Sequence, residues 1–257
     1  MSRKFVGFLA PTVALLLLIG AWQLAADTGA LADLLDLDSF FVPSPSEIAT
    51  VLWEDRSLLA DNAWVTIQEV LIGFAGAVAL GAAVAALLYL SPALRRTFYP
   101  LVVASQAIPI IVIAPILVVW LGFGIGPKVA IVILICFFPI VVNALDGLAT
   151  TSEDQRKLMR SLGASPVQTF TTLEAPSALP FMFSGAKVAA AVAVIGAVFG
   201  EWAGSTSGLG HLMLLDNGQL EVARLFASVV LLALIAMALF ALLALAERRF
   251  VWWAGER

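Results

Sequence analysis

The segment VAIVILICFFPIVVNAL, residues 129–145, contains no charged side chain and is the stretch that decides the fold. A helix that crosses a hydrocarbon core of about 30 Å takes about 20 apolar residues, so a charge-free segment of this length is typical of a membrane span. The composition agrees, because 61% of the residues are hydrophobic, 12% are charged and the mean hydropathy is +1.02. A soluble domain has about 45–50% apolar and about 25% charged residues. The chain is therefore predicted to be a membrane protein.

Five further apolar segments lie along the chain and, with this one, account for most of its 257 residues. We expect an all-α polytopic membrane protein that forms a single transmembrane domain over residues 1–257. Its six transmembrane helices are expected at about residues 5–26, 64–92, 97–122, 127–148, 177–202 and 222–246. Arg3 and Lys4 ahead of the first apolar segment also fit a secretory signal. Because five more spans follow, the first helix is expected to remain uncleaved.

The positive charges predict the orientation, because Lys and Arg in short loops are retained on the cytoplasmic side. With the N-terminus inside, the inside segments hold ten of the fourteen cations: Arg3, Lys4, Arg95, Arg96, Arg156, Lys157, Arg160, Arg248, Arg249 and Arg257. Both termini and the loop 149–176 are therefore expected in the cytoplasm. Lys128 then falls in an outside segment, as does the acidic stretch 27–63.

The composition also excludes several classes of function. The net charge is −4, with 14 Lys and Arg against 18 Asp and Glu, so a nucleic-acid-binding surface is not expected. Cys136 is the only cysteine, which excludes a disulfide framework and a cysteine-based zinc site. His211 is the only histidine, which excludes the HExxH zinc motif, and we assign it no chemistry.

Prolines break the third span. Pro109 and Pro115 lie inside it, as does Pro100, and an interior proline removes a backbone hydrogen bond and can kink the helix. Such breaks are tolerated in a membrane where protein or a watery cavity satisfies the freed carbonyls. Pro109 and Pro115 are therefore candidates for lining a transport pathway, with a purely structural kink as the alternative.

Small residues recur along two other spans. They lie at four-residue spacing at Gly73, Ala77, Gly81 and Ala85, and again between Gly185 and Gly204. Small side chains let helices approach closely in lipid. These stripes predict packing seams, either within the chain or with a second copy of it.

The loop 149–176 is too long for a simple connection and has helix signals of its own. Ser152 followed by Gln155 fits a capping box, and Gly163 supplies a left-handed stop. Ser165, followed by a proline and then a glutamine at the third position, fits a second capped start. Two short helices joined at Gly163 are therefore predicted.

Apolar side chains are predicted to project from these two helices. Leu158 and Leu162 are one turn apart in the first, Phe170 and Leu173 are close together in the second, and charged residues surround them. Pro176 is expected to end the second helix before the membrane. A soluble partner is one surface that would cover the apolar residues; the ends of the chain's own helices are the alternative.

The loop resembles that of permease subunits of binding-protein-dependent ABC importers. Their pattern runs Glu-Ala-Ala, three residues, Gly, nine residues, Ile, any residue, Leu-Pro. The chain keeps the glycine at Gly163, an aliphatic residue at Leu173 and the proline at Pro176. It departs from the pattern at residues 157–159, which are Lys-Leu-Met, and at Ala175.

Further segments extend the resemblance over most of the chain. VPSP (42–45), the prolines with their neighbours at 108–116 and WLGFG (120–124) resemble the branch that imports nitrate, sulfonates, taurine and thiamine precursors. GEWAGS (200–205) followed by GLG (208–210) is similar to members for thiamine-precursor pyrimidines or riboflavin. The resemblance thus implies a thiamine-precursor pyrimidine, a riboflavin-like compound or a sulfonate as substrate.

The resemblance implies the fold of a type I ABC importer permease in a bacterial plasma (inner) membrane. We call residues 149–176 the coupling loop. The resemblance implies that this loop contacts two cytoplasmic ABC ATPase subunits. The matching positions are Leu158, Leu162, Gly163, Ala164, Ser165 and Pro176. It also implies a second permease copy, expected as a homodimer, and an external solute-binding protein. The sequence lacks a Gly-x-x-x-x-Gly-Lys-Ser/Thr loop, so the chain is expected to be no enzyme and to hold no cofactor; ATP and Mg belong to the partner.

Two charged residues fall in or near the membrane. Lys187 lies within the fifth span, where snorkelling to the cytoplasmic interface is the plain explanation. Glu201 and Trp202 end that span and are candidates for the outer mouth of the pathway, with an ordinary helix end as the alternative. On the pathway reading, Glu201→Gln leaves assembly intact and reduces uptake.

Two other functions compete with the importer. A self-contained secondary transporter would normally show internal repeats and polar residues near the midplane of the membrane. An intramembrane enzyme would need a nucleophile with a base, or a metal cluster. The sequence offers neither a convincing repeat nor such a constellation, so an ABC importer permease is the function predicted.

Overall fold

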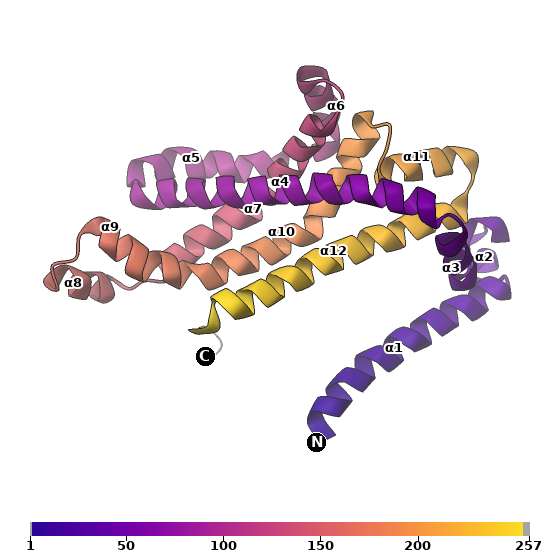
Figure 1. Ribbon diagram of the computed structural model, residues 1–257, viewed down its shortest axis with the longest axis horizontal. Helices are drawn as coiled ribbons and strands as arrows, with labels where there is room; N and C mark the ends of the chain where they lie inside the picture. The colour runs from indigo at the N-terminus through magenta and orange to yellow at the C-terminus, as the bar shows by residue number, and fades with distance from the viewer. Residues whose placement is uncertain (1, 254–257) are drawn as a thin grey trace. The chain divides into compact units, whose positions relative to one another are not determined.

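The structure, a computed structural model, describes residues 2–253, with side chains from residue 12 onward. Every regular element in this range is helical (Figure 1), which confirms the all-α prediction. The chain forms two compact units, Met1–Ala63 with Leu212–Leu231, and Trp64–His211 with Leu232–Arg257. All the functional residues predicted from the sequence lie in the second unit.

The first unit begins with α1 (Ser2–Asp27), α2 (Ala30–Leu35), a 3-10 turn (Ser39–Phe41) and α3 (Pro45–Glu54). Ser44 caps α3 in a reciprocal capping box with Glu47. Gln23 of α1 accepts a hydrogen bond from the backbone N–H of Ser46 at 3.0 Å and donates one to its hydroxyl at 2.9 Å. These contacts join α1 to the start of α3.

The same unit contains the turn between α11 (Leu209–Gln219) and α12 (Val222–Phe250). Arg224 lies 2.7 Å from the buried carboxylate of Asp216 and 3.4 Å from Asp55, which follows α3. Burial raises the pKa of Asp216, and the ion pair with Arg224 opposes that rise. Arg224 of α12 therefore connects its own helix to α11 and to the end of α3.

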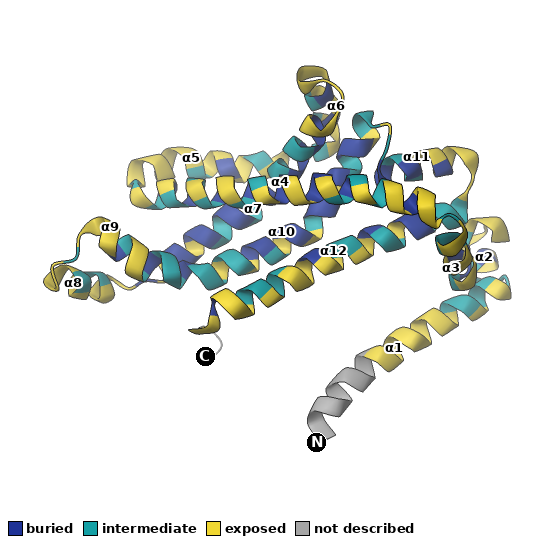
Figure 2. Ribbon diagram, viewed as in Figure 1, coloured by how far each residue is buried: buried dark blue, intermediate teal, exposed yellow. Residues whose placement is uncertain are grey.

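The second unit is built around α7 (Ile125–Ala149) and α10 (Ala175–Gly204), which pack side by side (Figure 1). Buried residues concentrate along these two helices, whereas α5 (Pro92–Ala104) is largely exposed (Figure 2). Cys136 lies in the seam between α7 and α10; it is 0% exposed, and its thiol donates to the carbonyl of Ala189 at 3.4 Å.

Glycines allow the close approach of helices to α7. A Cβ on Gly73 of α4 (Arg56–Leu90) would lie 2.5 Å from the Cβ of Val132, and one on Gly185 of α10 would lie 2.7 Å from the carbonyl oxygen of Pro139. Real Cβ atoms do not approach so closely, so the space beside each of these glycines is occupied by atoms of α7. The two predicted packing seams are therefore contacts between helices of the same chain.

The predicted spans correspond to helices of the structure with different ends. Among the described residues, the helices long and apolar enough to cross a membrane are Arg56–Leu90, Ile125–Ala149, Pro166–Gly204 and Val222–Phe250. A bent pair, Pro92–Ala107 with Ile110–Leu121, would make a fifth span. The described part of the first predicted span is a shorter apolar helix, Thr12–Asp27. The count of six remains a prediction.

The third predicted span, 97–122, is not one straight helix. The axes of its two parts, which include α5 and α6 (Ile110–Leu121), differ by 101°. Pro109 stands at the break: Ile108 before it is extended, with ψ 119°, because a residue that precedes proline is disfavoured in the helical region. Pro100 and Pro115 lie inside α5 and α6, whereas Pro109 is the N-cap of α6 and stands between two helical segments.

Candidate functional site

The coupling loop contains two capped helices, α8 (Glu153–Ser161) and α9 (Pro166–Thr169). The Ser152 hydroxyl accepts from the N–H of Gln155 at 3.3 Å, and the Gln155 side chain accepts from the N–H of Ser152 at 2.9 Å. Ser165 forms the same box three residues ahead of its glutamine. Gly163 between the helices has φ 80°, which favours glycine. The predicted helix-glycine-helix arrangement is confirmed.

The second helix does not end at Pro176, contrary to the prediction. α9 continues through a π turn (Phe170–Glu174) into α10, so one helix runs over Pro166–Gly204. Pro176 is the second residue of α10 and directly follows the π turn, so it lies inside this continuous helix. The end of the coupling loop is therefore continuous with a helix long enough to span the membrane.

Three large hydrophobic side chains of the loop are exposed. Leu158 is 59% exposed and Leu162 is 74% exposed, as predicted. Val167, which the sequence analysis missed, is 71% exposed. Phe170 and Leu173 were expected to project from the second helix, but both are half-buried, and the Phe170 ring lies 6.4 Å from the ring of Tyr89. The exposed apolar group thus comprises Leu158, Leu162 and Val167.

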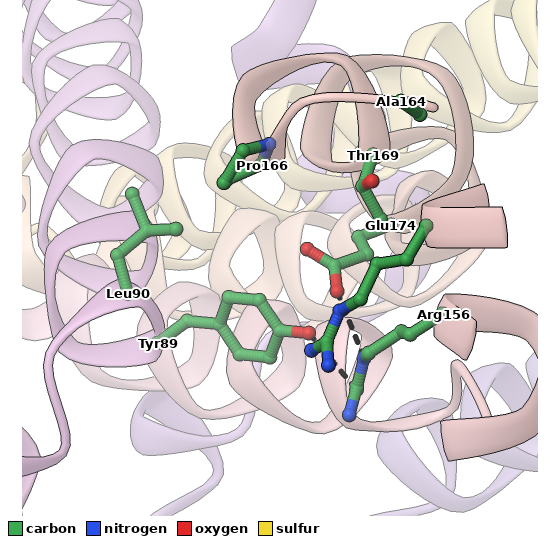
Figure 3. A pocket seen from close by; sticks show the side chains of 8 residues that line it. Tyr89, Leu90, Arg156, Ala164, Pro166, Thr169 and Glu174 are labelled. Carbon is green, nitrogen blue, oxygen red and sulfur yellow. Dashed lines mark hydrogen bonds and ion pairs between the residues drawn. The ribbon is translucent and has the colours of Figure 1, made fainter. Parts of the chain in front are cut away.

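Arg156 connects this loop to two longer helices. Its Nε donates to Oε1 of Glu174 at 2.9 Å, and its Nη2 donates to the hydroxyl of Tyr89 at 3.0 Å (Figure 3). The guanidinium carbon also lies 5.9 Å from the centre of the Tyr89 ring. Glu174 is buried, so its charge needs this partner. Arg156 therefore fixes α8 relative to the end of α4 and the start of α10.

These residues line a cavity of about 420 Å³ beneath the loop. Its lining comprises Tyr89, Leu90, Arg156, Arg160, Ala164, Pro166, Thr169 and Glu174. The sequence analysis missed the group formed by Arg156, Glu174 and Tyr89. They are 18 and 67 residues apart and lie in different helical elements, so only the opposite charges of Arg156 and Glu174 indicated a pair. Among the described residues, no cluster of His, Cys, Asp or Glu is arranged to hold a metal ion.

The predicted pathway residues occupy two regions of the second unit. Pro109 and Pro115 are exposed on α6. Glu201, near the end of α10, is 1% exposed, and its carboxylate accepts from the hydroxyl of Thr66 at 2.6 Å. Trp202 beside it is 41% exposed, and its ring N–H donates to the carbonyl of Gly210 at 2.9 Å. Their role in a pathway stays a prediction.

Two lysines have partners that the sequence analysis missed. Lys187 pairs with Glu247 of α12 at 2.8 Å, so it has an ion pair in addition to any snorkelling. Lys128, which the sequence analysis assigned to an outside segment, is 6% exposed, and its ammonium lies 2.8 Å from Glu69 of α4 and 2.6 Å from the hydroxyl of Ser205. The reason is that α7 begins at Ile125 and carries Lys128 into the packed region.

Comparison with known proteins identifies the family. The model of the family described as "Binding-protein-dependent transport system inner membrane component" matches residues 77–252. The chain is 35% identical to the formylaminopyrimidine transport permease protein ThiX of Halalkalibacterium halodurans, over 100% of both chains. It is 34% identical to the riboflavin transport system permease protein RibX of Chloroflexus aurantiacus, over 95% of this chain and 90% of that one.

A solved structure supports the fold. An inward-facing structure of the MetNI methionine ABC transporter matches 78% of this chain and 98% of its own, with a TM-score of 0.66 and 20% identity. The arrangement of helices is therefore that of a type I importer permease, as predicted. The secondary transporter and the intramembrane enzyme are set aside by the family match. The chain belongs to the family of binding-protein-dependent transport system inner membrane components and is a permease subunit of an ABC importer.

Proposed function

We propose that the coupling loop is the surface by which this permease engages its ATPase subunits. The observation that carries the proposal is the exposed apolar group on an otherwise charged loop. Leu158 and Leu162 are four residues apart and so lie on one side of the first loop helix. Burial of one leucine side chain contributes about 1.5–3 kcal/mol, so a partner that covers both leucines gains about 3–6 kcal/mol toward binding.

The rigidity of the loop supports the same proposal. A segment that transmits movement must keep its shape when it is displaced. The capping boxes at Ser152 and Ser165 fix both helix starts, Gly163 fixes the angle between them, and Arg156 ties the first helix to α4 and α10. Ala164 and Pro176 complete the set of positions that we assign to coupling.

The remaining components follow from the family. We propose that two copies of this chain form the pathway, that ATP and Mg are bound by two partner ATPase subunits, and that a solute-binding protein delivers the substrate from outside. The coupling loop and both termini then face the cytoplasm of a bacterial cell. Pro109, Pro115 and Trp202 are exposed residues that we assign to the pathway, with Glu201 as the neighbour that fixes the turn beside Trp202.

The substrate that we propose is a planar nitrogen heterocycle. The two relatives at 34–35% identity are named for formylaminopyrimidine and for riboflavin, and both compounds belong to that class. An exposed indole such as Trp202 offers a flat face on which such a ring can stack. A sulfonate is the alternative from the same branch.

The test is affinity purification of the tagged permease from its native membrane in mild detergent. We expect an ATPase subunit to co-purify with it in equal amount. Leu162→Asp places a charge on the covered face, and we expect it to reduce the recovered ATPase about tenfold or more, since about 1.4 kcal/mol corresponds to a factor of ten. Leu34→Asp, on an equally exposed leucine of α2, is the matched control. Unchanged recovery with Leu162→Asp would contradict the coupling surface.

The purified complex also tests the substrate. After reconstitution in proteoliposomes with its binding protein, we expect ATP-driven uptake of labelled formylaminopyrimidine or riboflavin and little uptake of taurine. Uptake of taurine alone would favour the sulfonate alternative. Uptake without an ATPase subunit would contradict the importer mechanism itself.

A further inference from the structure

An apolar groove of about 470 Å³ lies in the second unit, between α4, α5 and α7. Its floor is packed, since Leu88 of α4 and Val102 of α5 are buried and belong to one hydrophobic cluster. Its rim is open, because Leu87 of α4 and two residues of α5, Phe98 and Leu101, are exposed. The groove therefore offers an apolar surface to whatever surrounds these helices.

The length of the groove matches one leaflet of a membrane. Along α5 it is lined by Leu94, Phe98, Leu101 and Val102, which recur on one face of the helix, and by Ser105 directly after it. From residue 94 to residue 105 a helix rises about 16 Å. Half of a hydrocarbon core is about 15 Å. The described residues that line the groove include no charged side chain, so its interior suits a hydrocarbon chain.

Two arginines stand at one end of the groove. Arg95 and Arg96 directly follow Leu94 in the first turns of α5, and both are exposed. No ion pair joins either of them to an acidic residue in the part of the chain that the structure describes. Arginine binds phosphate oxygens through two parallel N–H groups. The groove thus begins beside two positive charges that lack a counter-charge.

This end of the groove lies on the side of the coupling loop. Tyr89 and Leu90 directly follow the groove residues of α4, and both line the cavity beneath the loop (Figure 3). Ser91 then caps α5, so the turn between the two helices is short. Two arginines at the start of an apolar helix are typical of the membrane surface, where the phosphates of lipid headgroups lie.

We propose that this groove binds an anionic phospholipid, with one acyl chain along α5 and the headgroup phosphate held by Arg95 and Arg96. The apolar lining and its length fit an acyl chain of one leaflet. Two unpaired cations favour a headgroup with a net negative charge over a zwitterionic one. A second permease copy would also cover the apolar rim, but it would have to bring carboxylates to the two arginines.

The site gives the lipid a place beside the attachment of the coupling loop. A chain in the groove contacts Leu87 and Leu88, and the next residue, Tyr89, accepts a hydrogen bond from Arg156 of the loop. A bound lipid therefore supports the helix end to which the loop is attached. The site requires only that these helices lie in a membrane, so it stands or fails independently of the ATPase contact.

Native mass spectrometry of the full-length permease, stripped of lipid in mild detergent, tests the site. The protein is titrated with dioleoyl phosphatidylglycerol or with dioleoyl phosphatidylcholine. We expect one lipid per chain and a preference of about tenfold or more for phosphatidylglycerol. The double variant Arg95→Gln/Arg96→Gln should lose this preference and keep its affinity for phosphatidylcholine. Equal affinities in the wild type, or a preference that survives in the double variant, would overturn the proposal.

A second pair of arginines is the matched control. Arg248 and Arg249 are adjacent, exposed and in the last turn of α12, and neither lines the groove. We expect Arg248→Gln/Arg249→Gln to retain the preference for phosphatidylglycerol. An equal loss in both double variants would mean that the lipid responds to the total charge of the protein, which would contradict a site at Arg95 and Arg96.

The groove itself is tested by filling it. Leu87→Trp adds a bulky ring at the rim, so we expect weaker binding of both lipids. Leu71→Trp, on an exposed leucine of the same helix outside the groove, is the control and should bind both lipids as the wild type does. All the substituted positions are exposed, so the variants are expected to fold. Unchanged binding in Leu87→Trp would place the lipid elsewhere.

A crosslinking experiment tests the rival occupant. With Leu101→Cys at the exposed rim, oxidation in the membrane should produce no disulfide between two permease copies, because lipid lies between the groove and its surroundings. A crosslinked dimer in high yield would show that a second copy covers the groove and would overturn the lipid site.

Discussion

At the scale of single residues, Arg156 determines how the coupling loop is attached. It is the partner of a buried carboxylate and of a tyrosine hydroxyl, and these two groups belong to different helices. A lysine could carry the charge, but it lacks the several fixed N–H groups that reach Glu174 and Tyr89 together.

Replacement of Arg156 by methionine should therefore destabilise the protein by about 2 kcal/mol, because the largely buried Glu174 is left as an unpaired charge. Adding Glu174→Gln removes that charge, so we expect the double variant to recover part of the loss. Thermal unfolding of the wild type, both single variants and the double variant measures this. If the two losses simply add, Arg156 and Glu174 do not act as a pair.

Residue pairs of this kind are what the sequence could not predict. The ion pair of Lys128 with Glu69 was missed because Glu69 lies in another helix and nothing in the spacing of the two residues connects them. Lys187 with Glu247 and Arg156 with Glu174 are of the same type. Interactions within four residues along the chain, such as the two capping boxes of the loop, were predicted correctly because a local pattern contains both partners.

At the scale of helices, α7 depends on the absence of side chains at its contacts. A Cβ on Gly147 would lie 2.9 Å from the Cα and 3.0 Å from the carbonyl oxygen of Ala178. Both are backbone atoms of α10, which cannot move aside as a flexible side chain can. α7 and α10 would have to separate at this point.

We expect Gly147→Ala to destabilise the protein by about 1–3 kcal/mol, the usual cost of overpacking. Gly20→Ala in α1 is the control, since nothing lies within 4 Å of its Cβ and alanine favours a helix by up to about 1 kcal/mol. Thermal unfolding of both variants gives the comparison. A Gly147→Ala protein as stable as the control would show that the seam is looser than the structure indicates.

Helix ends were harder to predict than helices. The three prolines of the third span were read as equivalent breaks, yet Pro109 stands between two helical segments as the N-cap of α6, while Pro100 and Pro115 lie within helices. Pro176 was read as an end and lies in a first turn after a π turn. The outcome depends on whether the carbonyl that a proline leaves free finds another partner, and this is settled by neighbours that the local sequence does not contain.

At the scale of the whole molecule, hydropathy was sufficient for the fold class, because a helix is the one structure that satisfies its own backbone in lipid. The sidedness of the chain rests on the distribution of Lys and Arg. Ser161 in the coupling loop and Asp38 in the acidic segment are both exposed, so a cysteine placed at either position would be accessible to a reagent.

We expect a cysteine at Asp38 to react with a membrane-impermeant maleimide in intact cells whose outer surface is accessible. A cysteine at Ser161 should react only after the membrane is opened. The extent of labelling on the purified chain measures both. The reverse pattern would place the coupling loop outside and would contradict its assignment to the ATPase partner.

The burial of Cys136 makes such experiments direct. Because the thiol of Cys136 is buried between α7 and α10, the native chain offers thiol reagents no accessible cysteine among its described residues. Spin labels, fluorophores or crosslinkers can therefore be attached at single chosen positions of the natural protein, without first removing a cysteine. Because the native cysteine is buried in the contact between α7 and α10, it does not contribute background labelling when the movements of this permease are followed.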